Sequence, residues 1–207
     1  MAQIESHKIL AWIYGKGRGS VFTPKDLQPL ASNDNLRITL RRLTAEGKIR
    51  RLLRGVYEYP EFSRLLNAPA SPDPDAIARA IARAHGWTIL PEGNTALNLL
   101  SLSTQVPAQW QYFSDGPTKS IHWSGGVIAF KHRANKETTG LSPETALLVQ
   151  ALKALGEDHV DGTVLCTLRE RISEKAFARA VREARYATSW VYEIIKRLAE
   201  KKEAAHA

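Results

Sequence analysis

The chain has 207 residues and a formal net charge of +8, with 43% hydrophobic and 24% charged residues. This composition excludes a disordered or fibrous chain and leaves room for one large domain or two small ones. The longest apolar runs, such as ALLVQAL, fall far short of the roughly 18 residues that a membrane helix needs, and no secretory leader is recognisable, so we expect a cytoplasmic protein.

The positive charge is concentrated in the first third of the chain. Residues 1–66 hold 12 Lys and Arg against 6 Asp and Glu, whereas residues 67–207 hold 17 against 15. Concentrated positive charge favours a polyanionic partner. The N-terminal third is therefore the part that we expect to contact nucleic acid.

The first region predicts three helices and a hairpin. A helical apolar face over residues 4–14 is followed by a second helix that starts at Pro24, with Thr23 as its N-cap. A third helix ends at Gly47, and two β-favouring runs, 49–53 and 56–59, then flank a turn. Three compact helices followed by a basic hairpin are typical of a winged helix-turn-helix.

The third helix and the hairpin carry the candidate DNA contacts. Leu36, Leu40 and Leu43 recur at helical spacing, so the opposite face presents arginines. Arg can bond bidentately to guanine and Asn to adenine, while arginines on the hairpin are better placed to meet phosphates. The residues that we expect to contact DNA are Asn33, Asn35, Arg37, Thr39, Arg41, Arg42, Arg50, Arg51 and Arg54.

The segment NAPASPDPD, residues 67–75, alternates prolines with small and polar residues and predicts a linker. We therefore expect a winged helix-turn-helix domain at 1–66 and a mixed α/β domain at 76–207, an α+β fold as a whole. The second domain predicts helices at 74–86, 94–103, 142–156 and within 173–202, and strands at 87–91, 109–115, 119–123 and 126–133.

Signals for catalysis are weak in this sequence. HWSGG lacks the first glycine of a nucleophile elbow, and Ala129 stands where a nuclease motif would need a carboxylate. His122 and His132 read as strand residues rather than metal ligands, and Cys166 reads as a buried structural thiol. We expect no catalytic residue, metal or cofactor.

The pattern LRITLRRLTAEGKIRRLLRGVYEYP at 36–60 resembles the N-terminal winged helix of AbiEi-type antitoxins. LPEGNTALNLLSLSTQVPAQWQYFSDG at 90–116, followed by GGVIAFKHR at 125–133, is similar to the middle of their C-terminal domain. The resemblance, over roughly residues 5–160, implies the antitoxin of a type IV toxin–antitoxin pair. Such a protein represses its own operon by binding operator DNA and counters a nucleotidyltransferase-like toxin.

Two other interpretations stay open at this point. The basic N-terminal region can instead be a protein-interaction module that docks an acidic partner without reading DNA sequence. A nucleic-acid-processing enzyme is the third interpretation, and metal-dependent cleavage of DNA would favour it.

Overall fold

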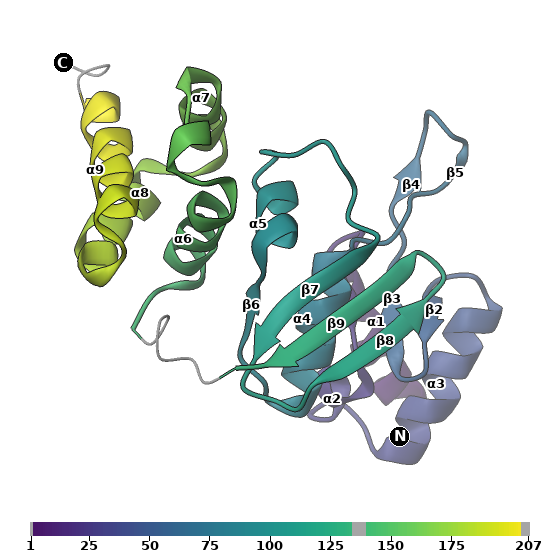
Figure 1. Cartoon of the computed structure of the whole chain (residues 1–207). Helices are drawn as coiled ribbons and strands as arrows, with labels where there is room; N and C mark the ends of the chain where they lie inside the picture. Colours follow the sequence, from purple (N-terminus) through teal and green to yellow (C-terminus); the bar gives the residue numbers. More distant parts are fainter. Residues whose placement is uncertain (1, 134–139, 204–207) are drawn as a thin grey trace. The chain divides into compact units, whose positions relative to one another are not determined.

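The computed structural model describes residues 2–133 and 140–203. The chain divides into two compact units, Met1–Thr88 with Ile121–Ile128, and Ile89–Ser120 with Ala129–Ala207. Helices and strands are both present in each half of the chain, which confirms the expected α+β class (Figure 1). Within the described ranges, no helix combines the length and the apolar character that crossing a membrane requires.

The first unit begins with three helices and a small antiparallel sheet of strand order β1-β3-β2. Isoleucines 9 and 13 of α1 and the three leucines of α3 are all buried in one apolar core. This core confirms the predicted inward face of the third helix. The elements are α1 (Ala2–Gly15), β1 (Val21–Phe22), α2 (Pro24–Leu27), α3 (Asn33–Ala45), β2 (Arg50–Leu53) and β3 (Val56–Glu58).

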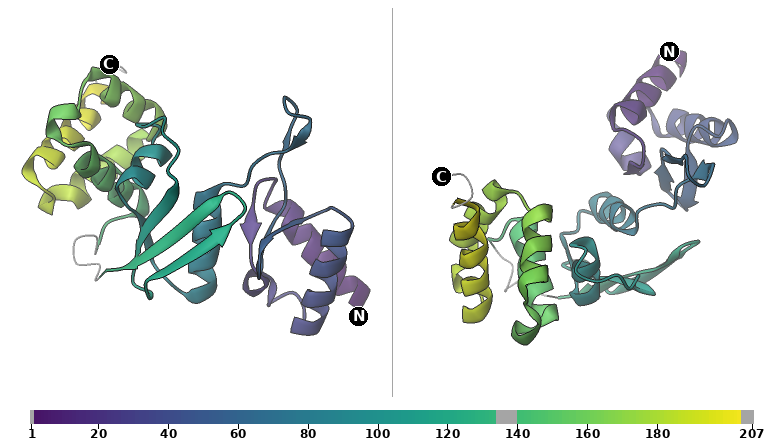
Figure 2. Two further views of the ribbon diagram at one scale, coloured as in Figure 1. Left: turned by 45° about the vertical axis from the view of Figure 1, so that its right-hand side comes forward. Right: turned by 90° about the horizontal axis from the view of Figure 1, so that it is seen from above.

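The segment expected to be a linker lies inside the first unit, and its two ends contribute to β5 and α4. β4 (Phe62–Ser63) pairs with β5 (Ala68–Pro69) in a separate hairpin that projects as an arm (Figures 1 and 2). The helix α4 (Pro74–His85) then packs against β1 and β3. Its apolar face, Ile77, Ala78 and Ile81, is at most 3% exposed, which is why the unit extends to Thr88 rather than ending before the prolines.

The second unit combines a sheet with a group of helices. The sheet has the order β6-β7-β9-β8, and the hairpin tip Ile121–Ile128 groups with the first unit. The elements are β6 (Ile89–Pro91), α5 (Gly93–Leu99), β7 (Gln109–Ser114), β8 (Lys119–Trp123), β9 (Gly126–His132), α6 (Pro143–Leu155), α7 (Gly162–Arg171), α8 (Glu174–Glu183) and α9 (Ser189–Glu203).

The helices α5 to α9 share one apolar core, which includes Leu152, Phe177 and Ile195. Sequence patterning predicted α6, α8 and α9 but not α7, whose exposed face carries Cys166. The expectation that this thiol is buried was therefore wrong. Leu165 and Leu168 are the only buried residues of α7, so its apolar signal is too short to stand out in the sequence.

Candidate nucleic-acid interface

The helix α3 is held in place by its core face and by its C-terminal cap. Gly47 adopts a left-handed φ of 67°, and the amides of Gly47 and Lys48 donate to the carbonyls of Thr44 and Leu43 at 3.1 and 3.0 Å. This is the Schellman arrangement, in which glycine is favoured because a Cβ would be strained at that φ. The cap fixes where α3 ends and where the basic hairpin begins.

Opposite the core, α3 presents a line of polar side chains spaced by four residues. Asn33, Arg37 and Arg41 are all exposed along this line, and Ile38 beside them is 62% exposed. Arg37 and Arg41 form no hydrogen bond or ion pair with any described residue. Their guanidinium donors are thus available to a ligand on the outside of the helix.

Two of the predicted contacts on α3 face inward instead. Thr39 is only 4% exposed, and its hydroxyl lies 3.1 Å from that of Ser6 on α1. The amide of Asn35 donates to the Glu5 carboxylate at 2.7 Å. Both side chains therefore join α3 to α1, and the expectation that Thr39 contacts DNA was wrong because the side chain is buried.

Arg42 lies outside but has a partner, since its Nε is 3.6 Å from Glu46. Lys48 approaches the same carboxylate more closely, at 2.8 Å. The Lys48 hydrogen bond is the main reason that the pKa of Glu46 lies below its usual value. Because Lys48 holds Glu46 and the Arg42 contact is long and exposed, Arg42 is held only loosely.

The hairpin of β2 and β3 turns at Arg54 and Gly55, where Gly55 has a φ of 79°. Arg54 is exposed and makes no hydrogen bond or ion pair within the described part of the chain. Arg51 is also exposed, and its one contact is a long hydrogen bond of 3.4 Å to the Leu53 carbonyl. The hairpin thus offers two outward cations close to its turn.

Arg50, the neighbour of Arg51, is used by the fold. It donates to Glu58 Oε2 from Nε and Nη2 at 2.8 and 2.6 Å, and to the Ala70 carbonyl at 2.7 Å. Glu58 is 2% exposed, and burial raises its pKa although Arg50 opposes the shift. Because this guanidinium is already bonded to Glu58 and Ala70, the structure does not leave Arg50 free for the predicted phosphate contact.

One exposed cation was missed by the sequence analysis. Arg64 lies in the turn between β4 and β5, next to Leu65 and Leu66, which are 94% and 71% exposed. The signal was the run FSRLLNAP, in which two short extended stretches flank the centre RLLN. The prolines of the segment 67–75 led to a linker being predicted there instead of a hairpin.

The described residues contain no group of three or more His, Cys, Asp or Glu side chains that could hold a metal ion. His132, the last residue of β9, is bound to the β7–β8 connection, since its Nδ1 lies 2.9 Å from the Gly116 carbonyl oxygen. Neither unit therefore brings the sequence's histidines together as a metal centre in these ranges.

The site and the fold together define an α+β protein with an exposed arginine-bearing helix beside a basic hairpin. This chain belongs to a family of unknown function, DUF6088, whose model matches residues 8–176. Among curated proteins none matches the sequence. Among solved structures, the RV2827C protein of Mycobacterium tuberculosis is similar over 95% of this chain and 76% of its own length, with 15% identity and a TM-score of 0.41.

Proposed function

We propose that this protein is a cytoplasmic transcriptional autoregulator that binds operator DNA through a winged helix-turn-helix in its first unit. The observation that carries the proposal is the line of Asn33, Arg37 and Arg41 on the exposed face of α3, where neither arginine is paired with a described residue. An ion pair with an acid three or four residues away on the helix would occupy these guanidinium groups. Here the outward arginines are left as donors.

In this proposal, α3 enters the major groove and the β2–β3 hairpin lies against the backbone. Arg37 and Arg41 provide the forked donors that guanine O6 and N7 accept, and the exposed Ile38 matches a thymine methyl group. Arg51 and Arg54 contact phosphates, which fixes the register on the duplex without reading sequence. The order helix, strand, helix, helix, hairpin supports this division of roles.

The second half of the proposal is that the protein is an antitoxin of the AbiEi kind, which counters a nucleotidyltransferase-like toxin. It is supported by the resemblance of residues 90–116 and 125–133, which belong largely to the second unit. Operator binding and toxin neutralisation are then separate tasks of one chain. No catalytic chemistry is assigned to either unit.

The DNA proposal is tested by gel shift of the full chain on the DNA upstream of its own gene, with scrambled duplex as competitor, at low and at higher salt. We expect binding that survives the competitor and weakens with salt. Arg41→Ala should reduce the affinity by roughly tenfold and relax the base preference at one position. Arg182→Ala, which removes an exposed arginine of α8, is the matched control and should change neither.

If the scrambled competitor abolished all binding to the upstream DNA, the protein would have no specific operator there. The first unit would then offer only a basic surface. In that case the alternative, a module that docks an acidic protein partner through the same arginines, takes precedence. Divalent-metal-dependent cleavage of the probe would instead favour the nuclease interpretation.

The antitoxin proposal is tested by growth of cells that express a nucleotidyltransferase-like toxin encoded beside this gene. We expect the full chain to restore growth, and Arg41→Ala to restore it as well when both proteins are expressed from independent promoters. Failure of the folded full chain to restore growth would contradict the antitoxin role while leaving the DNA proposal intact.

A further inference from the structure

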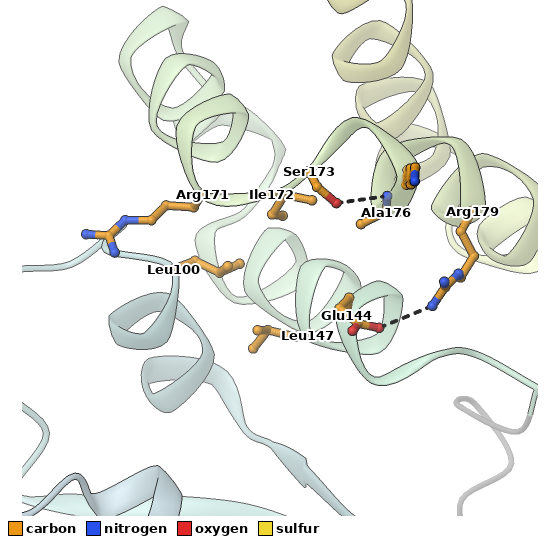
Figure 3. Close-up of a pocket in the computed structure, with 9 residues that line it drawn as sticks. Leu100, Glu144, Leu147, Arg171, Ile172, Ser173, Ala176 and Arg179 are labelled. Carbon is orange, nitrogen blue, oxygen red and sulfur yellow. Dashed lines mark hydrogen bonds and ion pairs between the residues drawn. The ribbon is translucent and has the colours of Figure 1, made fainter. Parts of the chain in front are cut away.

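A pocket of about 480 Å³ lies in the second unit, among α5, α6 and the junction of α7 with α8. Its volume is in the range of about 300–1,000 Å³ that ligand sites occupy. Figure 3 shows Leu100, Leu147 and Ile172 gathered at its centre, and Ala176 adds to the same wall. The floor of the pocket is therefore aliphatic.

Positive charge surrounds this floor. Arg171 ends α7 on one side and Arg179 stands on the other (Figure 3). Lys175, in the first turn of α8, also lines the pocket. The single carboxylate in the lining is Glu144, which lies 3.6 Å from Arg179 in an exposed pair. The lining thus carries an excess of positive charge.

Two of these cations are not engaged by the fold. Arg171 and Lys175 are exposed and form no hydrogen bond or ion pair with any residue in 2–133 or 140–203. Neither cation is therefore neutralised by an acid of the described ranges. The pocket therefore combines an apolar floor with unneutralised donors at its edge.

We propose that this pocket docks an acidic segment of a partner protein, in which an aliphatic side chain enters the pocket and flanking carboxylates meet Arg171 and Lys175. The proposal goes beyond DNA binding by α3 and does not depend on it. It assigns to the second unit a protein-binding surface of stated chemistry. The occupant is anionic and aliphatic at the same time.

The lining itself favours a peptide over a nucleotide or DNA. No aromatic side chain lines the pocket, so a base would find no stacking platform, which is the usual means of holding unpaired nucleotides. Leucine and isoleucine side chains fit an aliphatic floor, and carboxylates form charge-assisted hydrogen bonds with guanidinium and ammonium groups. An acidic peptide supplies both.

The test uses the full chain and a fluorescein-labelled peptide in which leucines are set among aspartates and glutamates, followed by fluorescence anisotropy. We expect saturable binding that weakens with salt. Lys175→Glu and Arg171→Glu should each weaken it by about tenfold, because each replaces an attraction by a repulsion at an exposed site. Arg197→Glu changes the charge equally on the exposed face of α9, outside the pocket, and should leave binding unchanged.

The probe itself tests the apolar anchor without altering the fold. A peptide with serines in place of the leucines should bind much more weakly, and one with lysines in place of the acids should not bind. The proposal would be overturned if the serine peptide bound as tightly as the leucine peptide. It would also be overturned if Arg197→Glu lost as much affinity as Arg171→Glu and Lys175→Glu. Circular dichroism of each variant shows that a loss of binding is not a loss of folding.

Two further outcomes separate this proposal from other occupants and from the DNA proposal. Arg41→Ala should bind the peptide normally, so that failure of operator binding and failure of peptide binding are distinguishable. Duplex DNA and unlabelled peptide should also be compared as competitors for the labelled peptide on Arg41→Ala. If both competitors displace it equally effectively, the pocket belongs to nucleic acid and the proposal is wrong. Self-association that the peptide reverses would assign the pocket to a second copy of the chain and overturn it too.

Discussion

Arg50 and Arg51 are adjacent on β2 and carry the same side chain, but the fold uses only the first. Arg50→Ala leaves the Glu58 carboxylate, whose side chain is 3% exposed, without its cation. Arg51→Ala removes one long hydrogen bond at the surface. The two substitutions should therefore separate stability from DNA binding.

The size of the stability loss in Arg50→Ala depends on how deeply the Arg50–Glu58 ion pair is buried. Removing one partner of a fully buried ion pair costs about 3–5 kcal/mol. The Arg50 side chain is 33% exposed, so water replaces part of what is lost, and we expect Arg50→Ala to lower the free energy of unfolding by about 2 kcal/mol. Arg51→Ala should stay within about 0.5 kcal/mol of the unsubstituted protein.

Urea unfolding followed by circular dichroism measures both values, and gel shift measures DNA affinity. Arg51→Ala should weaken binding to all sequences alike and reduce the salt slope by about one phosphate. Glu58→Gln in the Arg50→Ala background should recover part of the stability, because a neutral amide is less costly to bury than an unpaired carboxylate.

The pH dependence of Arg50→Ala has a defined sign. Burial raises the pKa of Glu58 above 4.5, its value in an unfolded chain, and Arg50 limits that shift. Without Arg50 the folded protein holds the proton more tightly, so stability is present at low pH and is lost as the pH rises through the raised pKa. Equal stability of Arg50→Ala and Arg51→Ala, with equal loss of DNA affinity, would refute the inward role of Arg50.

Three further predictions concern the residues that hold the first unit together. Asn35→Ala should lower the free energy of unfolding by about 1 kcal/mol without changing the salt slope of DNA binding, because the lost hydrogen bond is to Glu5 and not to a phosphate; a reduced slope would contradict this. Gly47→Ala should lower the thermal midpoint by an amount equivalent to about 1 kcal/mol, since its φ of 67° disfavours a Cβ; an unchanged midpoint would count against the cap. Burial opposes ionisation of Asp26, but its hydrogen bonds with Arg83 and Thr23 prevail and its pKa lies below 3.8. The stability that Asp26 contributes is therefore present above that pH and lost as the pH falls through the lowered pKa, and Asp26→Asn should flatten the acid limb of a stability curve.

The helices of this chain were predictable where capping residues marked their ends. Asp73, Pro74 and Gly86 bound α4 as expected, and the Asp73 carboxylate accepts from the Asp75 amide at 2.9 Å. Ser142 caps α6 in the same way. These signals are local, because a cap is made by side chains and amides a few residues apart, and so they can be read from sequence.

The domain boundary was not predictable from the same kind of signal. Prolines and small residues at 67–75 indicate a break in regular structure, but they do not show where the following helix packs. The position of α4 depends on burial of Ile77 and Ile81 and on the bond from Arg83 to the Val21 carbonyl at 3.2 Å. Such contacts join residues far apart in sequence, which composition cannot reveal.

The sequence does not show which of the adjacent residues Arg50 and Arg51 bonds to Glu58. A regular hairpin that turns at Arg54 and Gly55 would pair Arg51 with Glu58, and it would leave Arg50 for DNA. In the structure the register shifts between Arg51 and Leu53, so that Arg50 pairs with Glu58 and Arg51 with Tyr57.

One extra residue in a strand reverses which side chains face the core. The bulge therefore decides which arginine stabilises the fold and which remains for a ligand, although both are equivalent in composition and charge. A recognition surface consists of donors that the fold leaves available, and on α3 and the β2–β3 hairpin these include Arg37, Arg41, Arg51 and Arg54, all exposed. Mutagenesis of these four positions, rather than of the basic region as a whole, is consequently what distinguishes specific DNA contacts from general positive charge.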